Sequence, residues 1–107
     1  MSFLFEGGKL VESRHCRELG KILSNNLDRW NELRGALGIP ILDVKNVYDQ
    51  IKQNDGSVPA DTAFYSLIYH WISKSPKHAT FGHLLDILAW QLEFMESANQ
   101  ILEREWT

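Results

Sequence analysis

The stretch that most constrains the fold covers residues 63–88, AFYSLIYHWISKSPKHATFGHLLDIL. Apolar side chains recur there three and four positions apart, which is the spacing of one face of an α-helix. One stripe ends before Ser75-Pro76, and a second begins directly after Ala79-Thr80. The stripes consist of Phe64, Leu67, Ile68, Trp71 and Ile72, and of Phe81, Leu84, Leu85 and Leu88. Two amphipathic helices with a short link cannot bury these faces alone, so the rest of the chain must supply partner helices.

The same periodicity predicts four further helices, at about residues 13–24, 28–37, 41–53 and 93–105. Gly38 lies where a glycine commonly ends a helix, and Pro59 suits the first position of the helix that follows it. Thr80 is the expected N-cap of the helix after it. The side chains expected to face the core are His15, Leu19, Ile22 and Leu23; Trp30, Leu33, Ala36 and Leu37; Leu42, Val44, Val47 and Ile51; and Met95, Ala98, Ile101 and Leu102.

No segment shows the sustained period-two alternation of a β-strand. A chain of 107 residues suits one domain, and its four tryptophans provide large apolar bodies for one core. We therefore predict an all-α fold, a six-helix antiparallel bundle over residues 13–107, with an N-terminal extension over residues 1–12.

Composition narrows the classes of function. The net charge of −3 lacks the basic footprint of a nucleic-acid binder, and no apolar run approaches the ~18–20 residues of a membrane span. A single cysteine, Cys16, excludes an intramolecular disulfide and favours a reducing, cytoplasmic compartment. We expect Cys16 to be a buried thiol that packs as a small hydrophobe.

Motifs for chemistry are not found in the sequence. There is no G-x-S-x-G, no catalytic Cys/His signature and no glycine-rich phosphate loop, so we expect neither catalysis, nor a cofactor, nor a small-molecule substrate. Metal binding is not expected either, because the candidate ligands have no familiar zinc spacing. These candidates are His15, Cys16, His70, His78 and His83.

Three motifs together carry a resemblance to a known family. They are Trp30-x-x-Leu33-x-x-Ala36-Leu37-Gly38, Leu67-x-x-x-Trp71, and Ala79-Thr80 followed by Leu84, Leu85 and Leu88. In order and spacing, these motifs resemble the death domain of the death-fold superfamily over roughly residues 13–104. Gly35, inside the second helix, departs from the family pattern. The segment at residues 92–98 is similar to members of the Toll and interleukin-1 receptor pathways, and the spacing from Trp71 to Ala79 is equally similar to the Fas-associated adaptor.

The resemblance implies a non-catalytic module that assembles cytoplasmic signalling complexes, innate immune or apoptotic, through contacts with other death-domain proteins. It gives structural roles to core residues, namely Trp30, Leu33, Leu37, Trp71, Leu84, Leu85 and Leu88. It also implies three asymmetric surface pairs, in which opposite charges would meet. These set Arg14, Arg17 and Tyr65 against Arg34, Asp43 and Lys45; Lys74 and Lys77 against Glu93 and Phe94; and Asp49 and Lys52 against Asn25 and Asp28.

Two other classes remain open from the residues themselves. A structural helical domain of a larger protein, with no homotypic partner, would show one broad apolar patch in place of several charged ones. The other class is a helical module that binds nucleic acid. The net negative charge of the chain argues against it, since such binding depends on contacts between basic side chains and phosphates.

Overall fold

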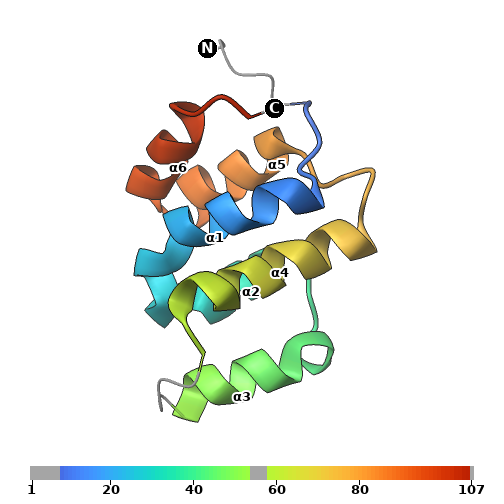
Figure 1. Cartoon of the computed structure of the whole chain (residues 1–107), viewed down its shortest axis with the longest axis vertical. Helices are drawn as coiled ribbons and strands as arrows, with labels where there is room; N and C mark the ends of the chain where they lie inside the picture. Colours follow the sequence, from blue (N-terminus) through green and yellow to red (C-terminus); the bar gives the residue numbers. More distant parts are fainter. Residues whose placement is uncertain (1–7, 54–57, 107) are drawn as a thin grey trace.

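The computed structural model describes residues 8–53 and 58–106, and within these ranges the chain is all-helical, as predicted (Figure 1). The α-helices are α1 Cys16–Leu23, α2 Trp30–Ala36, α3 Lys45–Gln53, α4 Ala60–Lys74, α5 Phe81–Asp86 and α6 Met95–Leu102. Shorter 3-10 segments are η1 Ser13–His15, η2 Ser24–Arg29 and η3 Ile41–Val44, and the π-helix η4 covers Ile87–Gln91. No β-strand forms in the described ranges; one isolated bridge joins Leu10 to Thr80.

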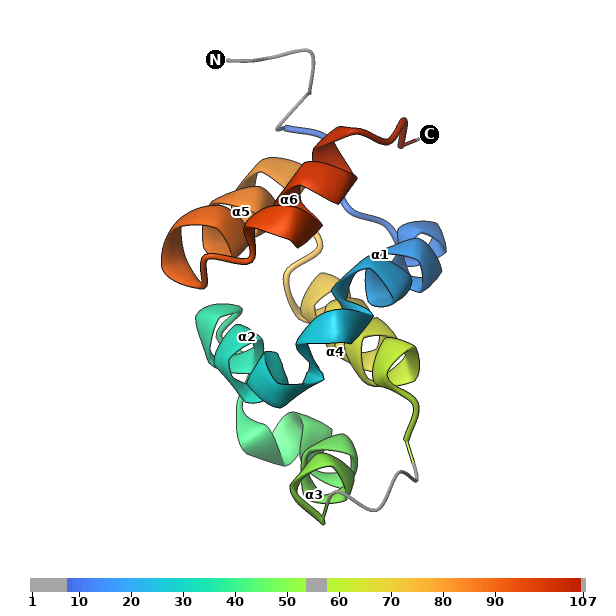
Figure 2. The ribbon, with the colours of Figure 1, turned by 90° about the vertical axis from the view of Figure 1, so that its left-hand side faces the viewer.

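Helices α1 and α4 lie side by side at the centre of the molecule, with α3 at one end and α5 and α6 at the other (Figures 1 and 2). Gly20 allows the central pair to approach closely. A Cβ atom added to Gly20 would lie 2.6 Å from the carbonyl oxygen of Asp61 and 3.2 Å from the backbone nitrogen of Tyr65. Because both neighbours are backbone atoms of α4, only glycine fits at this crossing.

The core forms around Trp30, whose side chain is fully buried and whose indole N–H donates to the carbonyl oxygen of Ala63 at 3.0 Å. This bond satisfies the one polar atom of the indole inside the apolar interior. Of the side chains assigned to the core by the resemblance, Leu33, Trp71, Leu84 and Leu88 are also buried. Leu37 and Leu85 are half-buried and pack against this core.

Three residues that the sequence places at helix ends also lie at helix ends in the structure. The Thr80 hydroxyl accepts a hydrogen bond from the His83 backbone N–H at 3.1 Å, which confirms Thr80 as the N-cap of α5. Gly38 has a φ of +76°, the left-handed conformation expected of a glycine after a helix. Pro59, which we predict as the first helical residue, is instead the N-cap of α4, one position before the helix begins.

Residues 9–11, here called the N-terminal strap, pack against the link between α4 and α5. The Val11 N–H donates to the Ala79 carbonyl at 2.7 Å, and the Phe81 N–H donates to the Lys9 carbonyl at 2.9 Å. The Val11 side chain is buried. This part of the predicted extension therefore belongs to the fold, while residues 1–7 lie outside the described residues.

Three apolar side chains predicted to face inward are exposed instead. Leu42 is 81% exposed because η3 is a four-residue 3-10 helix, whose tighter winding shifts the helical phase so that Val44 turns inward. Met95 and Leu102 are 53% and 47% exposed, since α6 begins at residue 95 and buries a stripe that includes Ser97. These three predictions are wrong.

Candidate interaction surface

The outer face of α4 carries an exposed pair of tyrosines, Tyr65 and Tyr69. Their rings stack with centroids 6.2 Å apart and an interplanar angle of 6°. The stacking follows from their spacing, because residues four apart lie one above the other on a helix. We call them the aromatic pair. Exposed tyrosines are common anchors of protein interfaces, since they bring a large contact area with little conformational entropy to lose.

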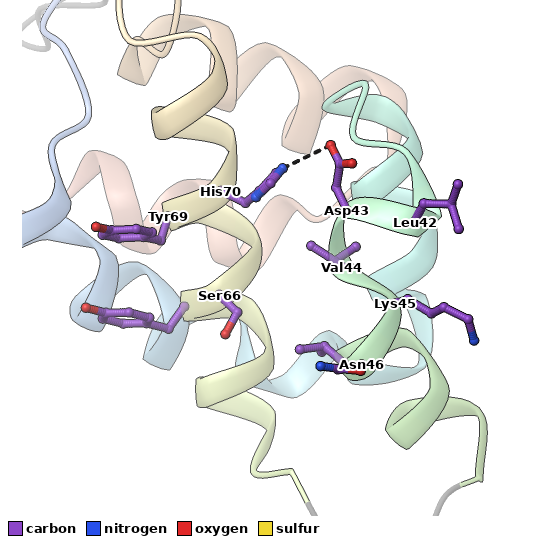
Figure 3. Close-up of a pocket in the computed structure, with 10 residues that line it drawn as sticks. Leu42, Asp43, Val44, Lys45, Asn46, Ser66, Tyr69 and His70 are labelled. Atoms are coloured by element: carbon purple, nitrogen blue, oxygen red, sulfur yellow. Dashed lines mark hydrogen bonds and ion pairs between the residues drawn. The ribbon is translucent and has the colours of Figure 1, made fainter.

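A groove of about 400 Å³ runs beside the aromatic pair, between α4 and the chain of η3 and α3. Figure 3 shows Val44 and Ser66 between the two elements, while Tyr69 and Leu42 point away from them on opposite sides. His70 and Asp43 point toward one another across one end of the groove. This α3–α4 groove thus combines apolar rims with a polar end.

Asp43 fastens η3 to α4 at that end. One of its carboxylate oxygens accepts a hydrogen bond from the Lys74 ammonium at 3.0 Å and lies 3.2 Å from Nε2 of His70. The hydrogen bond from Lys74, and then the one with His70, hold the pKa of the Asp43 carboxyl below its ordinary value of 3.8. Ionisation of the Asp43 carboxyl therefore strengthens its contacts with Lys74 and His70 at this end of the groove.

Replacing Asp43 with asparagine is expected to destabilise the fold at pH 7 and to have little effect near pH 2. A depressed folded pKa stabilises the native state above the unfolded pKa, and this contribution is lost as the pH falls through the folded value. We would measure urea midpoints of wild type and Asp43→Asn from pH 7 to pH 2. The exposed Asp86→Asn is the control. A gap between wild type and Asp43→Asn that stays constant with pH would show that packing, not charge, makes the difference.

A basic edge flanks the aromatic pair on the side of α1. Arg17 and Lys21 line a second hollow of about 360 Å³ together with Asp61, Thr62 and Tyr65. Neither cation is in an ion pair with any residue that the structure describes, and both are exposed. Tyr65 borders both hollows, so the basic edge, the aromatic pair and the groove form one continuous face.

The turn from α5 into α6 has an unusual backbone. α5 continues into the π-helix η4, and Glu93 then adopts a φ of +60°, the one positive φ of a non-glycine residue in the described ranges. Trp90, within η4, is 81% exposed. π-Turns and left-handed non-glycine residues are uncommon and are concentrated at functional sites. We call residues 86–96 the Trp90 turn.

Arg29 holds the Trp90 turn against α2. Its guanidinium donates to the Leu92 carbonyl at 2.8 Å, binds the Glu32 carboxylate at 2.8 Å and lies 4.7 Å from the centroid of the Phe94 ring. Phe94 is only 5% exposed. Its assignment as a surface anchor is therefore wrong, because the turn folds its ring beneath Arg29 and into the core.

The other residues assigned to interfaces fall into two groups. Several bind within the chain: Arg14 to Glu12, Lys45 to Asp49, Lys74 to Asp43, Arg34 to Asn31 and the Ile39 carbonyl, and Lys52 over the Tyr48 ring. The rest have exposed side chains and make no such bond to the residues that the structure describes: Arg17, Asn25, Asp28, Tyr65, Lys77 and Glu93. Asp43 and Lys74 thus bind each other within the chain. The predicted surface pairs place them in two different contacts between molecules.

Sequence reasoning did not assign His70 to this surface, whereas it places Tyr69 and Trp90 off the core stripes of their helices, as interface anchors if they are exposed. Tyr69 had a usable signal, because it lies one helical turn after Tyr65. His70 meets Asp43 across 27 positions of sequence, and no local pattern indicates such a contact. Trp90 is presented by a π-turn, which also has no simple sequence signature.

No cluster of three His, Cys, Asp or Glu side chains in the described ranges could hold a metal ion. No helix described in the structure is long and apolar enough to cross a membrane. Cys16 is buried, as expected, and burial raises the pKa of its thiol to about 11, which keeps it protonated at neutral pH.

Comparison of the chain with family models, with curated proteins and with solved structures gave no match.

Proposed function

We propose that this chain is a non-catalytic, death-domain-type interaction module that assembles cytoplasmic signalling complexes through contacts with other death domains. The observation that carries the proposal is the continuous face of α1 and α4, where the aromatic pair lies between the groove and two cations, Arg17 and Lys21, that form no ion pair within the described ranges. Aromatic side chains with a charged border are typical of protein interfaces. The buried Trp30 and Trp71 and the Thr80 cap support the same proposal, because the resemblance gives them these roles.

The internal ion pairs change which charges are best suited to recognition. Lys74 and Asp43 are bound to each other, so reversing either charge would disturb the junction of η3 and α4. Arg17 and Lys77 are exposed and without an ion pair in the described ranges, and their charges remain available for a partner. We therefore assign partner contacts to Arg17, Tyr65 and Lys77 before the other candidates.

The test is size-exclusion chromatography with light scattering on the chain alone and mixed with death domains of the Toll/interleukin-1 and Fas-associated types. We expect a partner-dependent increase in mass that Arg17→Glu or Lys77→Glu reduces and Lys77→Arg preserves. Loss of a rim charge chiefly slows association, so the effect of the reversals should weaken at high salt. A chain that stays monomeric with every partner at high concentration would contradict the proposal.

A structural helical domain within a longer polypeptide is the second candidate. It is favoured by the number of charged side chains that bind inside the chain, among them Arg29, Arg34 and Lys74. Such a domain would remain monomeric in the same experiment. Charge reversal at Lys77 would then leave both mass and stability unchanged.

A further inference from the structure

The exposed indole of Trp90 needs a reason, because tryptophan is usually well buried. It projects from a π-helix that is followed, three residues later, by the left-handed Glu93. Arg29 fixes this turn by bonding to the Leu92 carbonyl, so the exposure of Trp90 belongs to an anchored backbone. A fixed, solvent-exposed tryptophan is the kind of residue that dominates binding energy at interfaces.

The surroundings of Trp90 are acidic. Residues 84–103 contain four carboxylates and no lysine or arginine, and three of these carboxylates, Asp86, Glu93 and Glu96, are exposed within the Trp90 turn. The neighbouring Arg29 is bound to Glu32, which neutralises its charge. A surface that accepts the Trp90 turn must therefore offer a hollow for one large side chain beside a positive charge.

The face of α1 and α4 meets both requirements. The α3–α4 groove, at about 400 Å³, is within the ~300–1,000 Å³ of pockets that hold whole small molecules, so one indole fits. Asn46 and Ser66 line the groove and offer acceptors for an indole N–H. At the basic edge, two cations, Arg17 and Lys21, stand against one carboxylate, Asp61.

We propose that Trp90 of one copy of this chain inserts into the α3–α4 groove of a second copy, with the carboxylates of the Trp90 turn facing Arg17 and Lys21. The inference rests on the proposed function, in that the partner is a second copy of the domain. In Figure 2 the turn from η4 into α6 lies at the left edge of the molecule, and helix α4 lies apart from it, beside α1. Each copy therefore gives one surface and receives on another, which builds head-to-tail chains of copies.

The test uses two variants of the full chain that each remove one half of the contact. Trp90→Ala removes the inserted side chain, and Asn46→Arg fills the groove with a long side chain from an exposed position. Leu102→Ala is the matched control, because it truncates another exposed apolar side chain that belongs neither to residues 86–96 nor to the lining of the groove. Sedimentation velocity over a range of concentrations measures self-association, and circular dichroism checks that each variant is folded.

Wild type and Leu102→Ala are expected to associate with rising concentration, while Trp90→Ala and Asn46→Arg each associate about 30-fold more weakly. An equal mixture of the two variants should form a one-to-one dimer and stop there, since only one intact surface pair remains. Association of Trp90→Ala at the wild-type affinity, or a mixture that stays monomeric, would overturn this inference and leave the proposed function standing. A wild type that is monomeric at millimolar concentration would overturn it too, while binding to other death domains would still be tested by their mixtures.

Discussion

Replacing Trp30 with alanine is expected to lower the free energy of unfolding by about 3–5 kcal/mol. The side chain is fully buried, so its removal loses apolar burial and leaves a cavity that the surrounding helices fill only in part. The Ala63 carbonyl also loses the indole donor at 3.0 Å. Because domains of this size are stable by about 5–15 kcal/mol, urea denaturation followed by circular dichroism should show a large shift in midpoint.

Trp90→Ala is the matched control, since it makes the same chemical change at an 81% exposed position. We expect its effect on the monomer to stay within about 0.5 kcal/mol, as is usual for surface substitutions. Equal losses for the two tryptophans would contradict the packing described above. Such a result would mean that Trp90 is covered by the domain itself.

Replacing Gly20 with alanine is expected to lower the free energy of unfolding by about 1–3 kcal/mol. The added methyl group would lie 2.6 Å from the carbonyl oxygen of Asp61, and this backbone atom can move only if α1 and α4 separate. Since that pair forms the centre of the molecule, the strain cannot be relieved by rotation of a side chain. Thermal and urea denaturation at equal protein concentration would measure the loss.

Gly35→Ala makes the same substitution in the interior of α2, where the added Cβ would have no described atom within 4 Å apart from its chain neighbours and the backbone of its own helix. There the change should raise the free energy of unfolding by about 0.4–1 kcal/mol, because alanine restricts the unfolded chain and favours the helix. The two glycines are thus expected to respond with opposite signs. A stabilising Gly20→Ala would show that the helices cross at a greater distance.

Features that depend on a few neighbouring residues were well predicted from the sequence. The Thr80 cap and the left-handed Gly38 each follow from local backbone chemistry, and both are present. The stripe of α4 is long enough for its period to be read without ambiguity, so Phe64, Leu67 and Trp71 are buried together. The all-helical class follows from the same periodicity.

Errors arose where a change of helix type altered the phase. The 3-10 helix η3 exposes Leu42, and the turn that follows the π-helix η4 buries Phe94. Neither change has a sequence pattern as plain as a proline or a cap. The contact of Asp43 with Lys74 was likewise not predicted from the sequence, because it depends on how η3 and α3 pack against α4.

The N-terminal strap joins positions that are seventy residues apart, through the bridge of Leu10 and Thr80. Contacts between such distant positions close a long loop, which costs conformational entropy. They therefore form after the local contacts within the helices. Interactions absent from the transition state for folding act mainly on the unfolding rate. The strap should therefore slow the unfolding of the domain and so lengthen the lifetime of the folded state. It should have little influence on the folding rate.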